Sequence, residues 1–254
     1  MILPEFSHYP IDIHSHFNHG STGDCPDTLI HRRDLDFLMA GYDHIGIGAV
    51  GMSTYAAVLN HTECIEEENR YLYDYVQNCT RMYQWVVIDP RQEATFLQAE
   101  QMLGHRKVLG IKLHPACHKY DIEEYGDALF SFAAAHKAVV LMHPQKIEKM
   151  PTFANRYPDM KLIIAHLASM EHVDAIRCAE NGNIYTDTSG GASNMNAIVE
   201  YAVAQVGSEK ILFGTDTYAC AFQYGRIALS QLSREDKENI LYRNAVRMFP
   251  WAFA

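Results

Sequence analysis

Histidines stand where apolar, β-branched segments of this chain end. The first segment closes with Asp-Ile-His-Ser-His, in which one residue separates His14 from His16. Alternate residues of a β-strand point to the same face, so both imidazoles can reach one metal ion. This HxH pair therefore predicts a metal site at the end of the first strand.

Later apolar segments also end in histidine, or in lysine or aspartate. The residues concerned are Lys112, His114, His143, His166 and Asp216. Each is weak evidence alone, because a single buried histidine is commonly a core residue with its hydrogen bonds satisfied. Together, at the ends of strands that converge, they favour one catalytic centre.

Lys112 needs a separate explanation. It shares a strand face with His114 and is expected to point into the interior. An unpaired ammonium group is costly to bury. The lysine could pair with an acid, contact an anionic substrate, or be carboxylated to a bridging metal ligand, and the sequence leaves these three roles open.

Strands and helices must alternate to bring these residues together. Short β-branched runs alternate with longer segments whose apolar residues recur every three or four positions. The predicted strands are 9–14, 44–50, 84–89, 108–114, 138–143, 161–166, 183–187 and 210–214. The predicted helices are 28–40, 63–80, 91–105, 122–136, 151–156, 172–180, 194–206, 222–232 and 234–249. Gly41, Gly110, Gly182 and Gly207 are expected to mark the ends of elements.

This alternation predicts an α/β fold. Eight strand–helix units in 254 residues give about 32 residues each, the size of a βα unit. No Pro/Ser-rich linker divides the chain, so we expect one domain over residues 1–254. A closed (β/α)8 TIM barrel is favoured over a doubly wound sheet. In such a barrel the reactive groups lie at the C-terminal ends of the strands.

Composition excludes several classes of protein. The chain is 48% apolar, which excludes a mostly disordered protein, and its longest apolar runs are far short of the ~20 residues of a membrane span. A net charge of −10 argues against nucleic-acid or anionic-membrane partners. Six cysteines without a CxxC pair predict free thiols, and the N-terminus lacks a secretory pattern. We expect a cytoplasmic protein with a small-molecule substrate, and a homodimer as the default assembly.

Several motifs together resemble a known family. They are DIHSH, GIKLHP, LMHPQ, LIIAHLAS, NIYTDTSG, ILFGTDTY and the closing NAVRMF. This combination, spread over nearly the whole chain, resembles the amidohydrolase superfamily, and within it the amidohydrolase-2 type of metal-dependent TIM-barrel hydrolases and related decarboxylases.

The resemblance implies a set of metal ligands. For one ion the set is His14, His16, His143 and Asp216. His166 would then position substrate or water, or bind a second ion bridged by a carboxylated Lys112. One ion is favoured. Histidine and aspartate donors suit Zn²⁺ best, while Mn²⁺, Ni²⁺ and Fe²⁺ stay open.

The leading functional hypothesis is a hydrolase of a small amide, ester or lactone. Metal-bound hydroxide would attack the carbonyl carbon, with Asp216 as general acid and base and with His166 and Lys112 as further catalytic residues. Substrate contacts are expected from His114, His19 and Ser189.

Three other functions stay open. The alternative is a metal-dependent, non-oxidative decarboxylase of a small carboxylic acid. It would need cationic groups, of which the strand ends offer few beyond Lys112. A TatD-like nuclease is a more remote hypothesis, since such nucleases carry glutamate where this chain has Lys112. A non-catalytic metal-bound protein is also more remote.

Overall fold

Eight parallel strands surround one interior in the computed structural model, which describes residues 6–18, 35–59, 62–195, 197–217 and 220–253. Neighbouring strands follow the chain order from β1 to β8. The strands are β1 (Ile11–Phe17), β2 (Ala49–Thr54), β3 (Met82–Val87), β4 (Val108–Leu113), β5 (Val139–Met142), β6 (Lys161–Ile164), β7 (Ile184–Asp187) and β8 (Ile211–Leu212).

Backbone hydrogen bonds join β1 to the segment that follows β8 and complete the barrel. The backbone N–H of Ile13 donates to the carbonyl of Phe213 at 2.9 Å, and that of Asp216 donates to the carbonyl of His14 at 2.8 Å. The predicted TIM barrel is therefore confirmed. The closure also brings the HxH pair next to the segment that carries Asp216.

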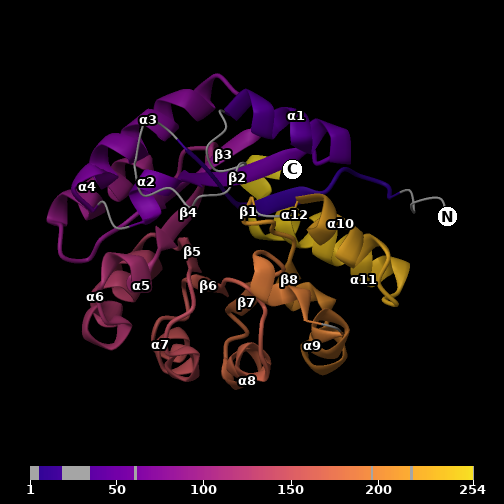
Figure 1. The fold of residues 1–254 in the computed structure, drawn as a ribbon. Helices are drawn as coiled ribbons and strands as arrows, with labels where there is room; N and C mark the ends of the chain where they lie inside the picture. Colours follow the sequence, from indigo (N-terminus) through magenta and orange to yellow (C-terminus); the bar gives the residue numbers. More distant parts are fainter. Residues whose placement is uncertain (1–5, 19–34, 60–61, 196, 218–219, 254) are drawn as a thin grey trace.

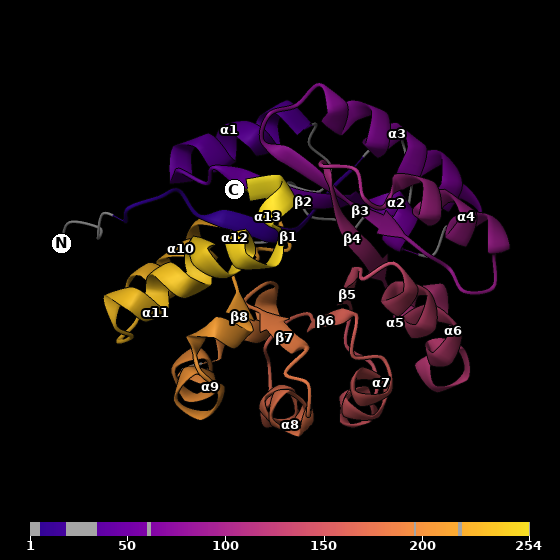
Figure 2. The same cartoon turned by 180° about the vertical axis from the view of Figure 1, so that it is seen from behind.

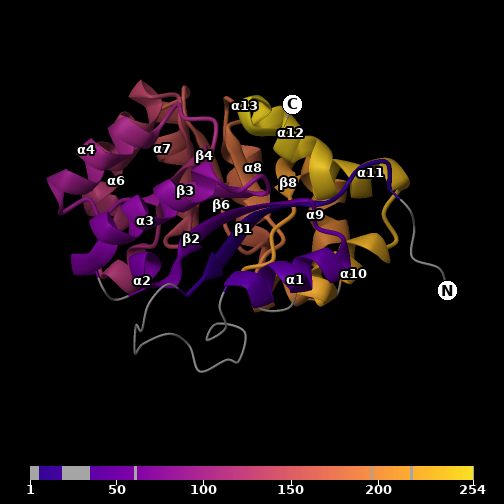
Figure 3. The same cartoon turned by 90° about the horizontal axis from the view of Figure 1, so that it is seen from above.

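Most helices lie outside the strands around the barrel, whereas α12 and α13 lie across one of its ends (Figures 1, 2 and 3). They are α1 (Leu35–Ile45), α2 (Tyr55–Val58), α3 (Ile65–Gln77), α4 (Glu93–Met102), α5 (Pro115–His118), α6 (Ile122–Ala135), α7 (Met150–Arg156), α8 (Met170–Cys178), α9 (Ile198–Val206), α10 (Cys220–Ala228), α11 (Arg234–Glu238), α12 (Asn244–Met248) and α13 (Pro250–Phe253). Short 3₁₀ turns are η1 (Thr62–Cys64), η2 (Ile147–Lys149), η3 (Gly191–Asn194) and η4 (Ser208–Lys210). A π-helical segment, η5 (Asn239–Arg243), joins α11 to α12 and interrupts the predicted helix 234–249.

The prediction around the second strand was wrong. Helix α1 continues through Gly41 to Ile45, where a strand over 44–50 was expected. The carbonyl of Tyr42 accepts the N–H groups of Gly46 and Ile47, which ends the helix there, and β2 begins at Ala49. The predicted start of this helix, at residue 28, lies outside the described residues.

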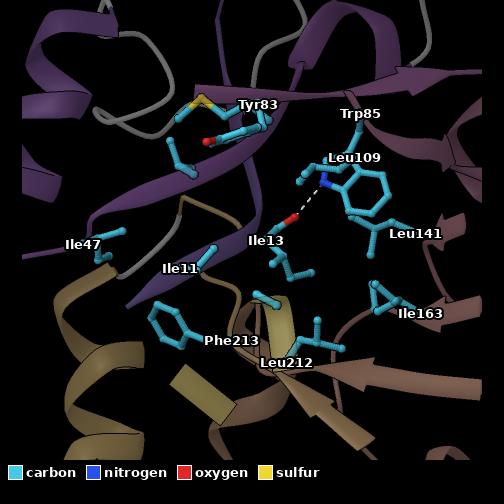
Figure 4. Packing of buried hydrophobic residues seen from close by; sticks show 14 of the residues in the cluster. Ile11, Ile13, Ile47, Tyr83, Trp85, Leu109, Leu141, Ile163, Leu212 and Phe213 are labelled. Carbon is cyan, nitrogen blue, oxygen red and sulfur yellow. Dashed lines mark hydrogen bonds between the residues drawn. The ribbon is translucent and has the colours of Figure 1, made fainter. Parts of the chain in front are cut away.

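Large apolar side chains fill the barrel interior (Figure 4). Trp85 lies among them, and its indole N–H donates to the carbonyl of Ile13 at 2.6 Å. Gly110 lies inside β4, not at the end of an element as expected. A Cβ at Gly110 would approach the carbonyl oxygen of Val139 to 2.0 Å, so close strand packing requires glycine here. This packed layer supports the polar residues at the C-terminal ends of the strands.

Two further expectations concern the whole chain. Five of the six cysteines fall in the described residues, and all five are free thiols. None of the helices in this part of the chain combines the length and apolarity that a membrane crossing requires.

Candidate metal centre and catalytic site

Three of the four predicted metal ligands lie together. Asp216 Oδ1 is 3.3 Å from His16 Nε2 and 3.7 Å from His14 Nε2. The donor atoms of all three lie within 4.8 Å of one another, in a largely buried position. Strand alternation in β1 places the two histidines on one face, and the segment after β8, which is hydrogen-bonded to β1, adds the carboxylate.

His14 is oriented by a buried carboxylate that sequence reasoning missed. Its Nδ1 lies 2.9 Å from Asp187 Oδ2, at the end of β7. An ionised carboxylate only accepts hydrogen bonds, so Nδ1 carries the proton and Nε2 keeps a free lone pair. Burial and the charge of Lys112 lower the pKa of His14 to about 3, so the ring is neutral at neutral pH.

Asp187 stays ionised although it is fully buried. Burial alone would raise its pKa, but His14 and the Ser189 hydroxyl outweigh that effect and hold the pKa below its usual range. The backbone N–H groups of His166 and Ser189 also donate to its Oδ1, at 3.1 and 2.8 Å. Asp187 therefore fixes both the tautomer of His14 and the chain positions of two other site residues.

Lys112 occupies the centre of this cluster. Its Nζ lies 2.6 Å from His14 Nε2, and burial lowers its pKa to about 8, although Asp216 and Asp187 oppose the shift. Burial would raise the pKa of Asp216, but the adjacent histidines His16, His14 and His166 outweigh burial and hold the pKa below its usual range. At neutral pH the cluster thus contains two carboxylates and one ammonium group.

His16 is held from behind in the same way as His14. Its Nδ1 lies 2.9 Å from Ser53 Oγ and 3.3 Å from the Ser53 carbonyl, near the end of β2. These contacts leave Nε2 directed toward Asp216. Ser53 was not predicted, because a serine at a strand end gives no signal of its own.

His166 is positioned by the loop that follows β7. Its Nδ1 lies 2.9 Å from Ser189 Oγ, and its ring centre is 5.0 Å from that of His14. Gly190 packs on this ring: a Cβ there would lie 2.7 Å from His166 Nδ1. Ser189 is fully buried, and its hydroxyl also contacts Asp187 and, at 2.8 Å, His14 Nδ1. The structure thus places Ser189 behind the site, whereas the sequence predicted a substrate contact.

His143 and His114 stack on each other. Their ring centres are 4.0 Å apart with an angle of 18° between the planes. His143 is not part of the three-residue donor cluster, and its buried Nδ1 has no hydrogen-bond partner in the part of the chain that the structure describes. Burial lowers the pKa of His143 to about 3, which leaves a neutral imidazole. His114 Nδ1 accepts the N–H of Cys117 at 3.2 Å and caps α5, and the predicted substrate residue His19 lies outside the described residues.

The donor set fits a divalent metal ion. Neutral imidazole nitrogens and an ionised carboxylate converge. His143 is a further candidate donor, because its Nδ1 has no hydrogen-bond partner among the described residues and its ring centre lies 5.1 Å from that of His166. A second group with close donor atoms is His14, His166 and Asp187. In this second group, His14 Nδ1 and Asp187 Oδ2 are already hydrogen-bonded to each other. This favours a single ion, bound by His14, His16 and Asp216.

A clamp behind the site holds β1 against the segment after β8. Asp12 Oδ1 accepts the backbone N–H groups of His14 and Thr215 at 3.0 and 3.1 Å, and Oδ2 accepts the Thr215 hydroxyl at 2.6 Å. Complete burial raises the pKa of Asp12 to about 7. The clamp fixes the spacing between the HxH pair and Asp216.

The barrel and its buried histidine–aspartate cluster define a TIM-barrel protein with a candidate metal centre. The chain belongs to the amidohydrolase family, because the family model described as Amidohydrolase matches residues 11–251. This confirms the resemblance seen in the motifs. No curated protein sequence matches the chain.

Solved structures with the same fold include several decarboxylases. The 5-carboxyvanillate decarboxylase of Sphingomonas paucimobilis has a TM-score of 0.76 and 14% identity, over 96% of this chain and 99% of that one. A dihydroxybenzoic acid decarboxylase of Polaromonas sp. JS666, with bound manganese, has a TM-score of 0.73 and 16% identity, over 96% and 97%. Amidohydrolase 2 from Bifidobacterium longum subsp. infantis has a TM-score of 0.66 and 21% identity, over 96% and 99%.

These comparisons correct the leading functional hypothesis. The prediction of an amide, ester or lactone hydrolase was wrong, since the similar structures are mostly decarboxylases of 5-carboxyvanillate and 2,6-dihydroxybenzoate. The expectation of zinc finds no support either, because the similar structures that are described with a bound metal hold manganese. A His/Asp donor set predicts a metal site but does not by itself specify the reaction.

Proposed function

We propose that this protein is a metal-dependent, non-oxidative decarboxylase of a small carboxylic acid, with hydroxylated benzoic acids as the first class to test. The fold shared with known decarboxylases supports the proposal. The observation that carries it is the buried ammonium group of Lys112 within the candidate ligand cluster. A carboxylate substrate needs a positively charged group to bind it, and Lys112 supplies one at this position.

The charge of the cluster favours an anionic substrate. Asp187 and Asp216 contribute two negative charges and Lys112 one positive charge, so the three groups carry one net negative charge. A divalent cation would change this to one net positive charge, in a buried place where uncompensated charge is costly. A carboxylate neutralises it, whereas a neutral amide or ester does not.

Decarboxylation replaces a carboxylate by a proton. The bond to the carboxyl carbon breaks, CO₂ leaves, and the electron pair left on the substrate carbon takes up one proton. A divalent ion held by His14, His16 and Asp216, with His143 as a fourth candidate, would supply a Lewis acid that stabilises negative charge on the substrate. Lys112 would bind the anionic group of the acid and hold it in place.

His166 is the best candidate to handle the proton. The Ser189 hydroxyl donates to Asp187 and therefore accepts from His166 Nδ1–H, which leaves Nε2 free to take up and release a proton. Asp216, the predicted general acid and base, is held ionised, so it carries no proton to donate at neutral pH. We therefore assign the proton to His166 Nε2 and a ligand role to Asp216.

The test is CO₂ release by the manganese-loaded protein. We would incubate it with 2,6-dihydroxybenzoate, 5-carboxyvanillate and other hydroxybenzoates, and in parallel with amide, ester and lactone substrates. We expect CO₂ and the decarboxylated product from at least one acid, and loss of both after chelation. Hydrolysis of a neutral substrate with no CO₂ from any acid would overturn the proposal.

A pair of lysine variants tests the carrying observation. Lys112→Met keeps the length of the side chain but removes the charge, and we expect a higher KM for the acid. Lys149→Met removes an exposed charge on the outer surface and serves as the matched control. An unchanged KM in Lys112→Met would show that this ammonium group does not recognise the acid.

A further inference from the structure

Two adjoining cavities lie at the end of the barrel opposite the candidate catalytic site. Figure 3 shows α12 and α13 at one end of the barrel, and α2 and α10, which follow β2 and β8, at the other. The smaller cavity, of about 290 Å³, is lined by Lys161, Tyr185, Glu209, Lys210, Asn244, Arg247 and Met248. The larger, of about 620 Å³, also includes Arg247, so this residue connects the two.

Arg247 is held in place by neutral groups. Its Nη1 donates to Asn244 Oδ1 at 2.9 Å, and its Nη2 donates to Asn239 Oδ1 at 3.2 Å. Both asparagines are buried and are themselves anchored, Asn239 to the Ser208 hydroxyl and Asn244 to the carbonyl of Ile211. The guanidinium group is thus fixed in position while its charge is left uncompensated, since the described residues offer it no ion pair.

The smaller cavity has an excess of positive charge. Lys161, Lys210 and Arg247 face a single acid, Glu209. Lys161 has no ion pair among the described residues, and Lys210 donates to the carbonyl of Gly182. In a chain of net charge −10, three cations at one cavity form a local site for an anion.

The larger cavity adds an apolar and aromatic wall. Tyr9, Ile11, Tyr242, Val246 and Phe253 line it, together with Ser7, His8, Gly48 and two arginines. Arg243 pairs with Glu238 at 2.5 Å, a carboxylate that it shares with Arg234, whereas Arg247 has no ion pair within the described residues. The π-helical segment η5 ends at Arg243, and such segments occur frequently at functional sites.

We propose that this end of the barrel binds a small organic acid with an aromatic body. The anionic group would bind Arg247 and the neighbouring lysines, and the aromatic body would pack in the larger cavity against Tyr242 and Phe253. A fixed guanidinium group pairs well with a planar carboxylate, which accepts two parallel hydrogen bonds. The site is separate from the catalytic centre and needs no metal, so it does not depend on the proposed decarboxylation.

Calorimetric titration with 2-naphthoate tests this site directly. We would use the chelator-treated full chain carrying Lys112→Met, which removes the cation of the catalytic cluster. We expect one saturable site per chain in this background. Loss of the site in Lys112→Met would place the binding at the catalytic centre and overturn the proposal.

Substitutions at the cavity separate charge recognition from other effects. In Arg247→Gln we expect the Kd for 2-naphthoate to rise by about tenfold or more, and in Lys161→Gln by a smaller factor. Lys161 makes no ion pair with a described residue, so its variant tests the site even where Arg247→Gln fails to fold. Arg177→Gln, on the outer face of α8, is the matched control and should leave the Kd unchanged. Unchanged binding in both cavity variants would refute the site.

Two further ligands test the class of molecule. The neutral 2-naphthamide should not bind measurably, because it lacks the charge, and inorganic phosphate should compete weakly, because it lacks the aromatic body. Equal binding of 2-naphthamide would exclude anion recognition. Equal competition by phosphate would exclude a role for the aromatic wall.

Discussion

Replacing Asp187 by asparagine should weaken metal binding without removing a single ligand. The substitution keeps the shape of the side chain and keeps Oδ1 as an acceptor for the backbone N–H groups of His166 and Ser189. It places an NH₂ group where Oδ2 now accepts from His14 Nδ1. Two donors would then face each other, so His14 must carry its proton on Nε2, the nitrogen that a metal ion needs.

The size of the effect follows from this tautomer change. Loss of a buried group that orients a metal-binding histidine typically lowers metal affinity by roughly 10- to 100-fold. That range corresponds to about 1.4 to 2.8 kcal/mol. We expect the upper part of the range, because Asp187 is fully buried and also orients Ser189 and His166.

The assay is a titration of Mn²⁺ against a fluorescent chelator of known affinity, with the wild type and Asp187→Asn compared at pH 7. Asp174→Asn changes an exposed carboxylate on α8 and is the control. Melting of the metal-free proteins would show whether the variant is folded at the titration temperature. A folded Asp187→Asn protein that binds Mn²⁺ as tightly as the wild type would refute the assignment of His14 as a ligand through Nε2.

Three more predictions follow from the buried groups. Gly190 has φ 70° and ψ 169°, a region of backbone conformation almost restricted to glycine. Gly190→Ala should therefore lower the free energy of unfolding by about 2 kcal/mol and lower kcat by displacing His166. A variant with normal stability and normal activity would contradict this prediction. Burial lowers the pKa values of His14 and His143 to about 3, so the folded metal-free protein binds fewer protons than the unfolded chain. Its melting temperature should therefore fall as the pH decreases from about 6.5 toward 3. A melting temperature that does not change over this range would show that these rings are not buried and neutral. The ammonium group of Lys107 donates to the carbonyls of three residues before and within β3. Lys107→Met should therefore lower the free energy of unfolding, measured by urea denaturation, by about 2 kcal/mol. The same substitution at an exposed lysine should have almost no effect.

The sequence predicted the residues that regular structure positions. The period of two along β1 placed His14 and His16 on one face, and the barrel topology brought Asp216 beside them. Asp187 was missed although it also ends a predicted strand. That position could have been found by the same reasoning that singled out the other strand ends.

The features of the site that could not be predicted from the sequence depend on loop conformation. His166, Asp216 and Thr217 have positive φ values between 57° and 64°, and no periodicity in the sequence encodes such backbone geometry. The end of α1 was misplaced because the helix passes through Gly41 and ends at Gly46, which has a φ of 84° and donates its N–H to the Tyr42 carbonyl.

Lys112 connects the metal site to the choice of substrate. Its Nζ contacts the same lone pair, on His14 Nε2, that a metal ion would use, so the ammonium group and the ion compete for this atom. Lys112→Met should therefore bind Mn²⁺ several-fold more tightly than the wild type, because it removes both a competitor and a nearby positive charge. A carboxylated, bridging Lys112 predicts the opposite result, weaker Mn²⁺ binding after the substitution. The same titration thus separates an ammonium group that is freed to bind the acid from a lysine that is itself a ligand.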